Sequence, residues 1–280
     1  KDVGVLPVQI SLDRFTNIDV NNELDKKLKQ QENILFTGRI VKNKKQIDVI
    51  KTFKLYREFF NKNAKLFLVG DKSNAEYLAQ VEKYIKNNGL EESVILPGKV
   101  SEQDLKTYYL NASVFLCMSE HEGFGVPLLE AMKLKVPVIA YDSSAIKETM
   151  DIGGITFEEK NYSLIAALID EINKNKDLRN KIINVQSERI DKLEKTDTEK
   201  LLDQIIEKFN CKHVESIQLQ GPFETSYSLA IVNRELIENI YNKNIYDVSI
   251  YATEGPGDYI PNEANLVDKP LAKKLYEKSK

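Results

Sequence analysis

The chain has 280 residues, of which 42% are hydrophobic and 30% charged, an ordinary composition for one to three globular domains. Its 40 basic and 43 acidic residues give a net charge of −3, which argues against a dedicated nucleic-acid-binding protein. The two cysteines, Cys117 and Cys211, have no metal-ligand spacing, and no apolar run approaches the roughly 20 residues that cross a bilayer. We therefore expect a cytoplasmic protein with reduced thiols, and docking at the inner face of the membrane is left open.

Short apolar runs alternate with longer amphipathic segments from residue 33 onward. We expect buried strands at 33–38, 65–71, 93–98, 113–118, 136–141 and 154–157. Apolar residues at helical spacing predict helices between them, marked by Val49, Phe53, Tyr56 and Phe60, by Leu78, Val81 and Ile85, by the run 126–134, and by the segment from about Tyr162. Asn88 and Gly89 end the second of these helices, and the run SEQD at 101–104 resembles a helix N-cap.

This alternation of almost wholly apolar strands with helices predicts an α/β fold with a doubly wound parallel sheet, covered on both faces. In such a sheet, ligands bind outside the carboxyl ends of the strands. Glycine and charge gather at those ends, at 38–39, 70–71, 98–99 and 119–125. We therefore expect the functional site at this edge of the sheet.

The pattern changes after the predicted sheet. Residues 175–209 are highly charged and helical in pattern, which fits a solvated helix packed on one side. A strand is then expected at 216–221, a helix along Leu229, Val232, Leu236 and Ile240, and another strand at 247–253. The sequence thus predicts a short, partial βαβ unit toward the C-terminus.

A run of ten residues, HEGFGVPLLE at 121–130, holds the most informative pattern. Glu122 falls in a glycine loop after a strand, and Glu130 in the first turns of the next helix. Pro127 suits an early helical position because its missing N–H is not needed there. The loop backbone and the helix N-terminus favour a phosphate group, and Glu130 can accept hydrogen bonds from paired hydroxyls such as those of a ribose. Taken alone, the glycines also fit a plain turn.

A second element is Gly38-Arg39 followed by Lys44. Arg39 lies just past the first predicted strand and Lys44 near the start of the first helix, so the two cations could clamp a diphosphate. The run 42–45 alone also fits the solvated start of a helix. The chain has no Asp-x-Asp triplet, no P-loop and no third glycine of a dinucleotide fingerprint. We therefore expect no metal and no other cofactor, and the pattern disfavours an NTPase or a dehydrogenase.

Together these elements resemble glycosyltransferase family four, the retaining enzymes with two facing Rossmann-like domains (the GT-B type). The matching stretches follow the family's order over about 32–180: 38–44, LFLVGD at 66–71, ILPGKV at 95–100, EGFGVPLLE at 122–130, AMKLKVPVIAY at 131–141 and AIKE at 145–148. The run 5–15 resembles the passage from the family's first domain into its second. The resemblance implies the donor-binding half of a sugar transferase, with a nucleotide-diphosphate sugar such as a UDP- or GDP-hexose as donor.

The resemblance also implies the donor-binding residues: Gly38, Arg39, Lys44, Gly98, Lys99, Val100, Glu122, Gly123, Phe124, Gly125, Val126 and Glu130. Arg39 and Lys44 correspond to the diphosphate contacts and Glu130 to a ribose-binding glutamate. Glu122 and the loop after it correspond to the sugar side, and 98–100 to the nucleobase side. Arg39, Lys44 and Glu122 are the expected catalytic residues. A cation ~4 Å from the leaving diphosphate contributes about 4 kcal/mol at an effective dielectric near 20, before desolvation is counted.

We accordingly expect four segments. They are 1–31, the end of a preceding acceptor domain with its linker; 32–180, the nucleotide-sugar-binding domain; 181–212, a charged helical connector; and 213–280, the start of a second glycosyltransferase. A terminal extension packed on the first sheet is the alternative for 213–280. Because the acceptor domain is missing, we expect this chain alone to be inactive and a glycan or lipid-linked acceptor to bind through that domain.

Two other functions stay open. A sugar-nucleotide epimerase on a similar scaffold would turn over a nucleotide sugar without any acceptor. A non-catalytic module would keep the fold and lose the activity, and a nucleotide-binding measurement discriminates it.

Overall fold

The computed structural model describes residues 12–196, 200–201, 204, 216–221, 223, 228–242, 247–252, 266 and 269–279. The chain divides into two compact units. The larger unit spans Leu12–Lys192, and the smaller contains the described residues from Leu193 onward. Each unit is considered by itself.

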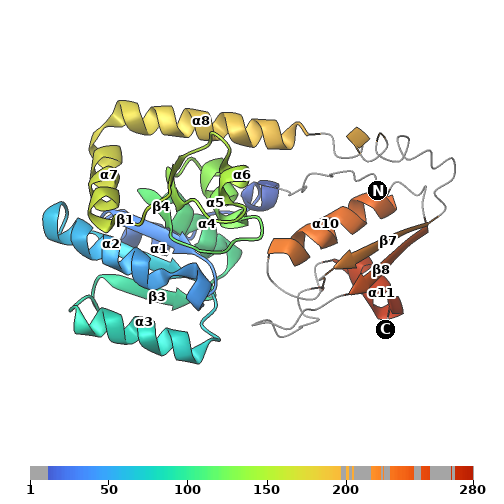
Figure 1. The fold of residues 1–280 in the computed structure, drawn as a ribbon, viewed down its shortest axis with the longest axis horizontal. Coiled ribbons are helices and arrows are strands. Elements are labelled where there is room, and N and C mark those ends of the chain that lie inside the picture. Colours follow the sequence, from blue (N-terminus) through green and yellow to red (C-terminus); the bar gives the residue numbers. More distant parts are fainter. Residues whose placement is uncertain are drawn as a thin grey trace. The chain divides into compact units, whose positions relative to one another are not determined.

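The larger unit is built on a six-stranded parallel sheet (Figure 1). Its strands are β1 (Asn33–Thr37), β2 (Lys65–Val69), β3 (Val94–Gly98), β4 (Val114–Cys117), β5 (Val138–Tyr141) and β6 (Ile155–Phe157). They lie in the order β3-β2-β1-β4-β5-β6. Strands β2 and β3 therefore extend the sheet on one side of β1, and β4, β5 and β6 extend it on the other side. The predicted doubly wound α/β sheet is confirmed, and each of the six expected strands is present.

Helices fill the connections between the strands. They are α2 (Gln46–Phe59), α3 (Ala75–Asn87), α4 (Glu102–Leu110), α5 (Val126–Lys133) and α6 (Ile146–Met150), followed by α7 (Tyr162–Lys174) and α8 (Lys176–Glu194). The predicted cap at 101–104 is confirmed, because the Ser101 hydroxyl accepts a hydrogen bond from the Asp104 backbone N–H. Gly89 follows α3 with φ +63°, as a glycine stop signal predicts. Four short elements of this unit were not predicted as elements of their own: η1 (Leu12–Phe15), α1 (Asn22–Leu28), η2 (Lys42–Lys44) and α6.

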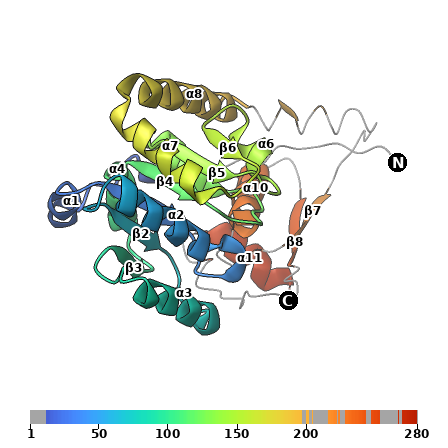
Figure 2. The same cartoon turned by 60° about the vertical axis from the view of Figure 1, so that its left-hand side comes forward.

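The helices form a layer on each face of the sheet (Figure 2). Helices α2, α3 and α7 lie on one face, while α4 and α5 lie on the other. All five residues of β1 and all four of β4 are buried, as expected of strands covered on both sides. At the carboxyl ends of β1 and β2 the backbones meet so closely that a Cβ on Gly70 would lie 2.0 Å from the Gly38 carbonyl oxygen. Only glycine fits there, and this brings the loops after the two strands together.

Segments on both sides of the predicted range 32–180 belong to this unit. The Lys106 ammonium donates to the backbone carbonyls of Phe15 and Ile18, at 2.8 and 2.6 Å. At the other end, the Gln186 side chain of α8 is fully buried and bonds the backbone N–H of Val138 and the carbonyl of Val136. The compact unit therefore extends to Leu12 and Lys192.

The smaller unit has its own core. Strands β7 (Ser216–Gly221) and β8 (Asp247–Ala252) pair in parallel, connected through α10 (Ser228–Asn242), and α11 (Pro270–Ser279) follows. One cluster of buried side chains joins these elements: Phe223, Ile237, Ile240, Val248, Ile250, Leu266, Ala272, Leu275 and Tyr276. The predicted partial βαβ unit is confirmed, and α11 is an addition to it. Across the described residues, no helix combines the length and the apolar composition needed to cross a membrane.

Candidate functional site

The strand order creates one switch point, between β1 and β4. The loop after β1 leads into α2 and the loop after β4 leads into α5, and these helices lie on opposite faces; in doubly wound sheets this is the point where ligands bind. The sequence places Gly38, Arg39 and Lys44 in the first loop and residues 119–125 in the second. The two predicted elements are therefore neighbours, although about eighty residues separate them in the chain.

Lys44 and Glu122 meet across this switch point. The Lys44 ammonium lies 2.5 Å from the Glu122 carboxylate, and the two side chains are only 15% and 8% exposed. The same ammonium donates to the His121 carbonyl oxygen at 3.3 Å. An ammonium has three N–H donors, so one remains for a ligand. The predicted diphosphate cation and the predicted sugar-side carboxylate thus form one preorganised pair.

The segment after β5 also holds the backbone of the loop 119–125. The Ser144 hydroxyl accepts from the Glu122 backbone N–H at 2.8 Å and donates to the Glu122 carbonyl at 3.0 Å. The Thr149 hydroxyl donates to the Phe124 carbonyl, and the Ser143 hydroxyl to the Ser119 carbonyl, both at 2.5 Å. These contacts fix the path of the loop, whose Gly123 is exposed.

Gly125 begins α5 in a left-handed conformation, with φ +76°. A Cβ at this position would lie 2.6 Å from a methyl carbon of Leu128, so the sharp entry into the helix requires glycine. No side chain caps this N-terminus, and the next residue, Val126, is buried. Backbone N–H groups and the helix dipole are consequently available to an anion at the switch point.

Glu130, the predicted ribose ligand, lies within α5 and is 7% exposed. Its Oε1 accepts from the Arg14 guanidinium and its Oε2 from the Tyr109 hydroxyl, each at 2.9 Å. Burial raises the pKa of Glu130, while the charge of Arg14 and the hydrogen bond from Tyr109 oppose the rise. Tyr109 is fully buried and also shares a hydrogen bond with Thr37 at the end of β1. Arg14 and Tyr109 therefore decide the position and the charge of this carboxylate.

The other predicted residues occupy the same edge of the sheet. Arg39 is half-buried just past β1, and its carbonyl accepts from the buried Gln46 side chain at 2.7 Å. Gly98 ends β3, on the far side of β2 from β1, with φ +81°. Lys99 is exposed and Val100 half-buried. Residues 98–100 thus lie farther along the edge than the Lys44–Glu122 pair, while their role stays a prediction.

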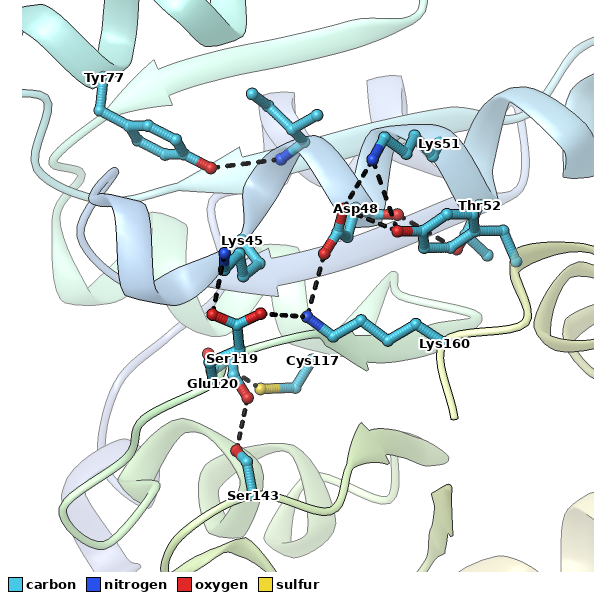
Figure 3. Close-up of polar contacts among 12 residues, drawn as sticks. Lys45, Asp48, Lys51, Thr52, Tyr77, Cys117, Ser119, Glu120, Ser143 and Lys160 are labelled. Carbon is cyan, nitrogen blue, oxygen red and sulfur yellow. Dashed lines mark hydrogen bonds and ion pairs between the residues drawn. The ribbon is translucent and has the colours of Figure 1, made fainter. Parts of the chain in front are cut away.

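A network of charged side chains continues from the site along α2 (Figure 3). Glu120 pairs with Lys45 at 2.8 Å and with Lys160 at 3.2 Å. Lys160 pairs in turn with Asp48 at 3.0 Å, and Asp48 also accepts from the hydroxyl of Tyr162. Cys117 is also buried in this region. Its burial raises the pKa of the thiol to about 11, and the nearby Glu122 carboxylate contributes to this higher pKa.

Sequence reasoning missed the side chains that support the site. Arg14, Tyr109, Ser144 and Lys160 carry no motif, and each lies in a different connection or helix from the residue it supports. Only Arg14 had a signal, since it falls in the run 5–15 that resembles an interdomain passage.

The larger unit is similar to known proteins in both sequence and structure. Residues 19–189 match the model of the family described as glycosyl transferases group 1. The capsular polysaccharide biosynthesis glycosyltransferase CapM of Staphylococcus aureus is 30% identical over 169 residues, which are 58% of this chain and 43% of CapM. The chain spans less than half the length of such curated relatives.

Two solved structures show the same fold. The C-terminal domain of LpcC, a glycosyl transferase group 1 family protein from Francisella tularensis, has a TM-score of 0.55 at 24% identity, with 65% of this chain and 97% of that chain covered. Anabaena Alr3699/HepE in complex with UDP and glucose has a TM-score of 0.56 at 17% identity, with 72% and 55% covered.

Proposed function

The chain belongs to the glycosyl transferases group 1 family, and from that premise we propose that the unit Leu12–Lys192 binds a nucleotide-diphosphate sugar as the donor for glycosyl transfer. The observation that carries the proposal is the buried Lys44–Glu122 pair at the switch point, beside the uncapped N-terminus of α5. It offers a cation and backbone donors to a diphosphate, and a fixed carboxylate to the group attached to it.

Each part of the site would have its own task. Arg39, the remaining donor of Lys44 and the N-terminus of α5 would stabilise the charge that develops on the leaving diphosphate. Glu122 would accept hydrogen bonds from the sugar, and Glu130 those from the ribose. Because these cations and dipoles can stabilise the leaving group, we propose transfer without a bound metal. Retention of the anomeric configuration, with the acceptor on the face that the diphosphate leaves, completes the proposal by analogy with the resembled family.

Hexosyl transfer to a glycan or a lipid-linked acceptor is the proposed reaction of the complete protein. The name of CapM refers to capsular polysaccharide biosynthesis, and Alr3699/HepE is described with UDP and glucose. UDP-hexoses are therefore the first donors to test, with GDP-hexoses second. The cytoplasm and the inner face of the membrane remain the proposed location.

The experiment is calorimetric titration of the chain with UDP, GDP and their hexose conjugates, with and without magnesium. We expect binding that Arg39→Ala and Glu130→Ala weaken, and no strict need for the metal. Equal affinity in the wild type and both variants would disprove the site. Steady release of a rearranged nucleotide sugar without acceptor would support the epimerase alternative, which the family match disfavours.

We further propose that residues 213–280 begin a second glycosyltransferase in a tandem polypeptide. Helices α10 and α11 contribute to one apolar cluster, while Ser216, Gln218, Asp247, Ser249 and Tyr251 are exposed along the strands. A two-stranded sheet with one covered face is a poor independent core, which suits the first part of a larger sheet. Limited proteolysis should cut near 205–215 and leave a fragment of the first unit that still binds nucleotide.

A further inference from the structure

The loop 119–125 also contacts lysines other than Lys44. Glu120 lies two residues before Glu122, and its backbone N–H donates to the Asn43 carbonyl at 2.8 Å. Its carboxylate lies between two ammonium groups, that of Lys45 at 2.8 Å and that of Lys160 at 3.2 Å. Residues 43–45 and 120–122 are therefore paired twice by charge, once through Lys44 and Glu122 and once through Lys45 and Glu120.

Lys160 comes from a different part of the chain, just before α7. Its side chain is 15% exposed, and its ammonium lies between the carboxylates of Glu120 and Asp48. The same ammonium lies 4.6 Å above the ring of Tyr141 at the end of β5. Asp48, only 13% exposed, pairs in turn with Lys51 (Figure 3) and also accepts from the hydroxyl of Tyr162. A half-buried lysine with three partners on three elements has little freedom to move.

From this geometry we infer that Lys160 is a positioning residue for the sugar side of the donor site. Through Glu120 it holds the loop 119–125 against residues 43–45, at the separation where Glu122 meets Lys44. Ser143, Ser144 and Thr149 support the same loop from the opposite side. The loop is thus held by two sets of contacts, one from Lys160 through Glu120 and one from the segment after β5. The inference rests on the proposed function.

The nucleoside side of the site has separate supports. Glu130 is held by Arg14 and Tyr109, and the backbone carbonyl of Arg39 accepts a hydrogen bond from Gln46. Loss of Lys160 should therefore change the binding of the sugar much more than that of the nucleoside diphosphate, of whose expected contacts Lys44 meets the loop 119–125 and Glu130 has separate partners. A general weakening of the fold would instead change both.

The test compares UDP with UDP-glucose, and GDP with GDP-mannose, by calorimetry on the complete chain. Lys160→Met should weaken binding of the sugar conjugate about tenfold, while the affinity for the free nucleotide stays within about twofold. Lys160→Arg should restore most of the loss, because a guanidinium can contact both carboxylates. The matched control is Lys174→Met, which removes an α7 lysine whose ammonium lies 2.8 Å from Asp170 on the surface. It should change neither affinity.

A double-mutant cycle keeps the inference falsifiable if one variant is unstable. Glu120→Gln should show the same selective loss, and the double variant with Lys160→Met should be no weaker than either single variant. Equal losses for the nucleotide and its sugar conjugate, or additive losses in the cycle, would overturn the positioning role. If the wild type binds neither nucleotides nor conjugates, the proposed function itself is wrong, and this outcome is distinct from a wild type that binds while Lys160→Met changes nothing.

Discussion

Replacing Arg14 by methionine should make both stability and nucleotide binding depend on the charge of Glu130. Glu130 is buried, and Arg14 and Tyr109 each bond one of its oxygens. Removing one partner of a buried ion pair costs about 3–5 kcal/mol when both groups are buried. Arg14 is 41% exposed, so water can replace part of its contact. We therefore expect Arg14→Met to lower the free energy of unfolding by about 1–2 kcal/mol near neutral pH.

The sign of the pH dependence follows from the pKa of Glu130. Burial raises that pKa in the folded chain, and Arg14 opposes the rise, so Arg14→Met must raise it further. A carboxyl whose pKa is higher in the folded than in the unfolded state binds more protons in the folded state. Its contribution to the free energy of unfolding is therefore fully present below the unfolded pKa, and it is lost as the pH rises through the folded pKa. The penalty of Arg14→Met should therefore be larger at about pH 8 than at about pH 5.

The assay is urea denaturation of the wild type and Arg14→Met at these two pH values, each repeated in a Glu130→Gln background. With glutamine at 130 no carboxylate is left to titrate, so the effect of Arg14→Met should become small and independent of pH. UDP binding by Arg14→Met should weaken as the pH falls, because protonation of Glu130 removes an acceptor for the ribose hydroxyls. A penalty that is equal at both pH values, or larger at the lower one, would refute this account of Glu130.

The remaining predictions concern the pair at the switch point, the sheet edge and the whole chain. Lys44→Ala should weaken UDP binding and destabilise the unit, and adding Glu122→Gln should recover part of the stability in a denaturation assay, because Lys44→Ala alone leaves a buried carboxylate unpaired. Gly70→Ala should lower the unfolding free energy by about 1–3 kcal/mol, since its Cβ would clash with the Gly38 carbonyl, and little change in the urea midpoint would contradict that geometry. The 280-residue chain alone should give no robust transfer from a radiolabelled donor, because the acceptor must be held against the sugar. Deletion of 213–280 should leave nucleotide binding intact, and loss of binding would show that this segment belongs to the first unit.

The sequence predicts the sheet well because its strands are short, apolar and followed by turn residues such as glycine. Runs such as 33–38 and 65–71 are largely buried and close with Gly38 and with Gly70-Asp71, so neither an amphipathic helix nor an exposed loop fits them. Short helices are not predicted because a periodic apolar pattern needs several turns to be recognised. Helix α1 spans seven residues and α6 five, too few for a helical apolar stripe to repeat. Their positions follow from tertiary contacts, such as the Asn21 cap of α1 that also bonds Asp104.

The site is predictable only in part, because its chemistry depends on strand order. The motifs predict that Arg39, Lys44 and Glu122 lie at strand ends, yet nothing in the pattern says that β4 lies beside β1. The Lys44–Glu122 pair follows once that order is known. Arg14 and Lys160 are harder still, since a single charged residue in a connection looks like any solvated one until the fold supplies its buried partner.

The charge pairing explains why such a site can be built before its ligand arrives. An unpaired charge is costly to bury, and Lys44 is matched by Glu122, while the partly exposed Arg14 is matched by Glu130 and Glu102. Under the proposed function, a diphosphate that enters would bring charge of its own, and it would gain stabilisation from donors that those pairs leave unused, such as the third N–H of Lys44 and the backbone at the start of α5. On the same proposal, the carboxylates of Glu122 and Glu130 would keep oxygen lone pairs for sugar and ribose hydroxyls. Pairing of the side-chain charges would then divide the tasks of the site, with backbone and spare N–H donors binding phosphate and fixed carboxylates binding hydroxyls.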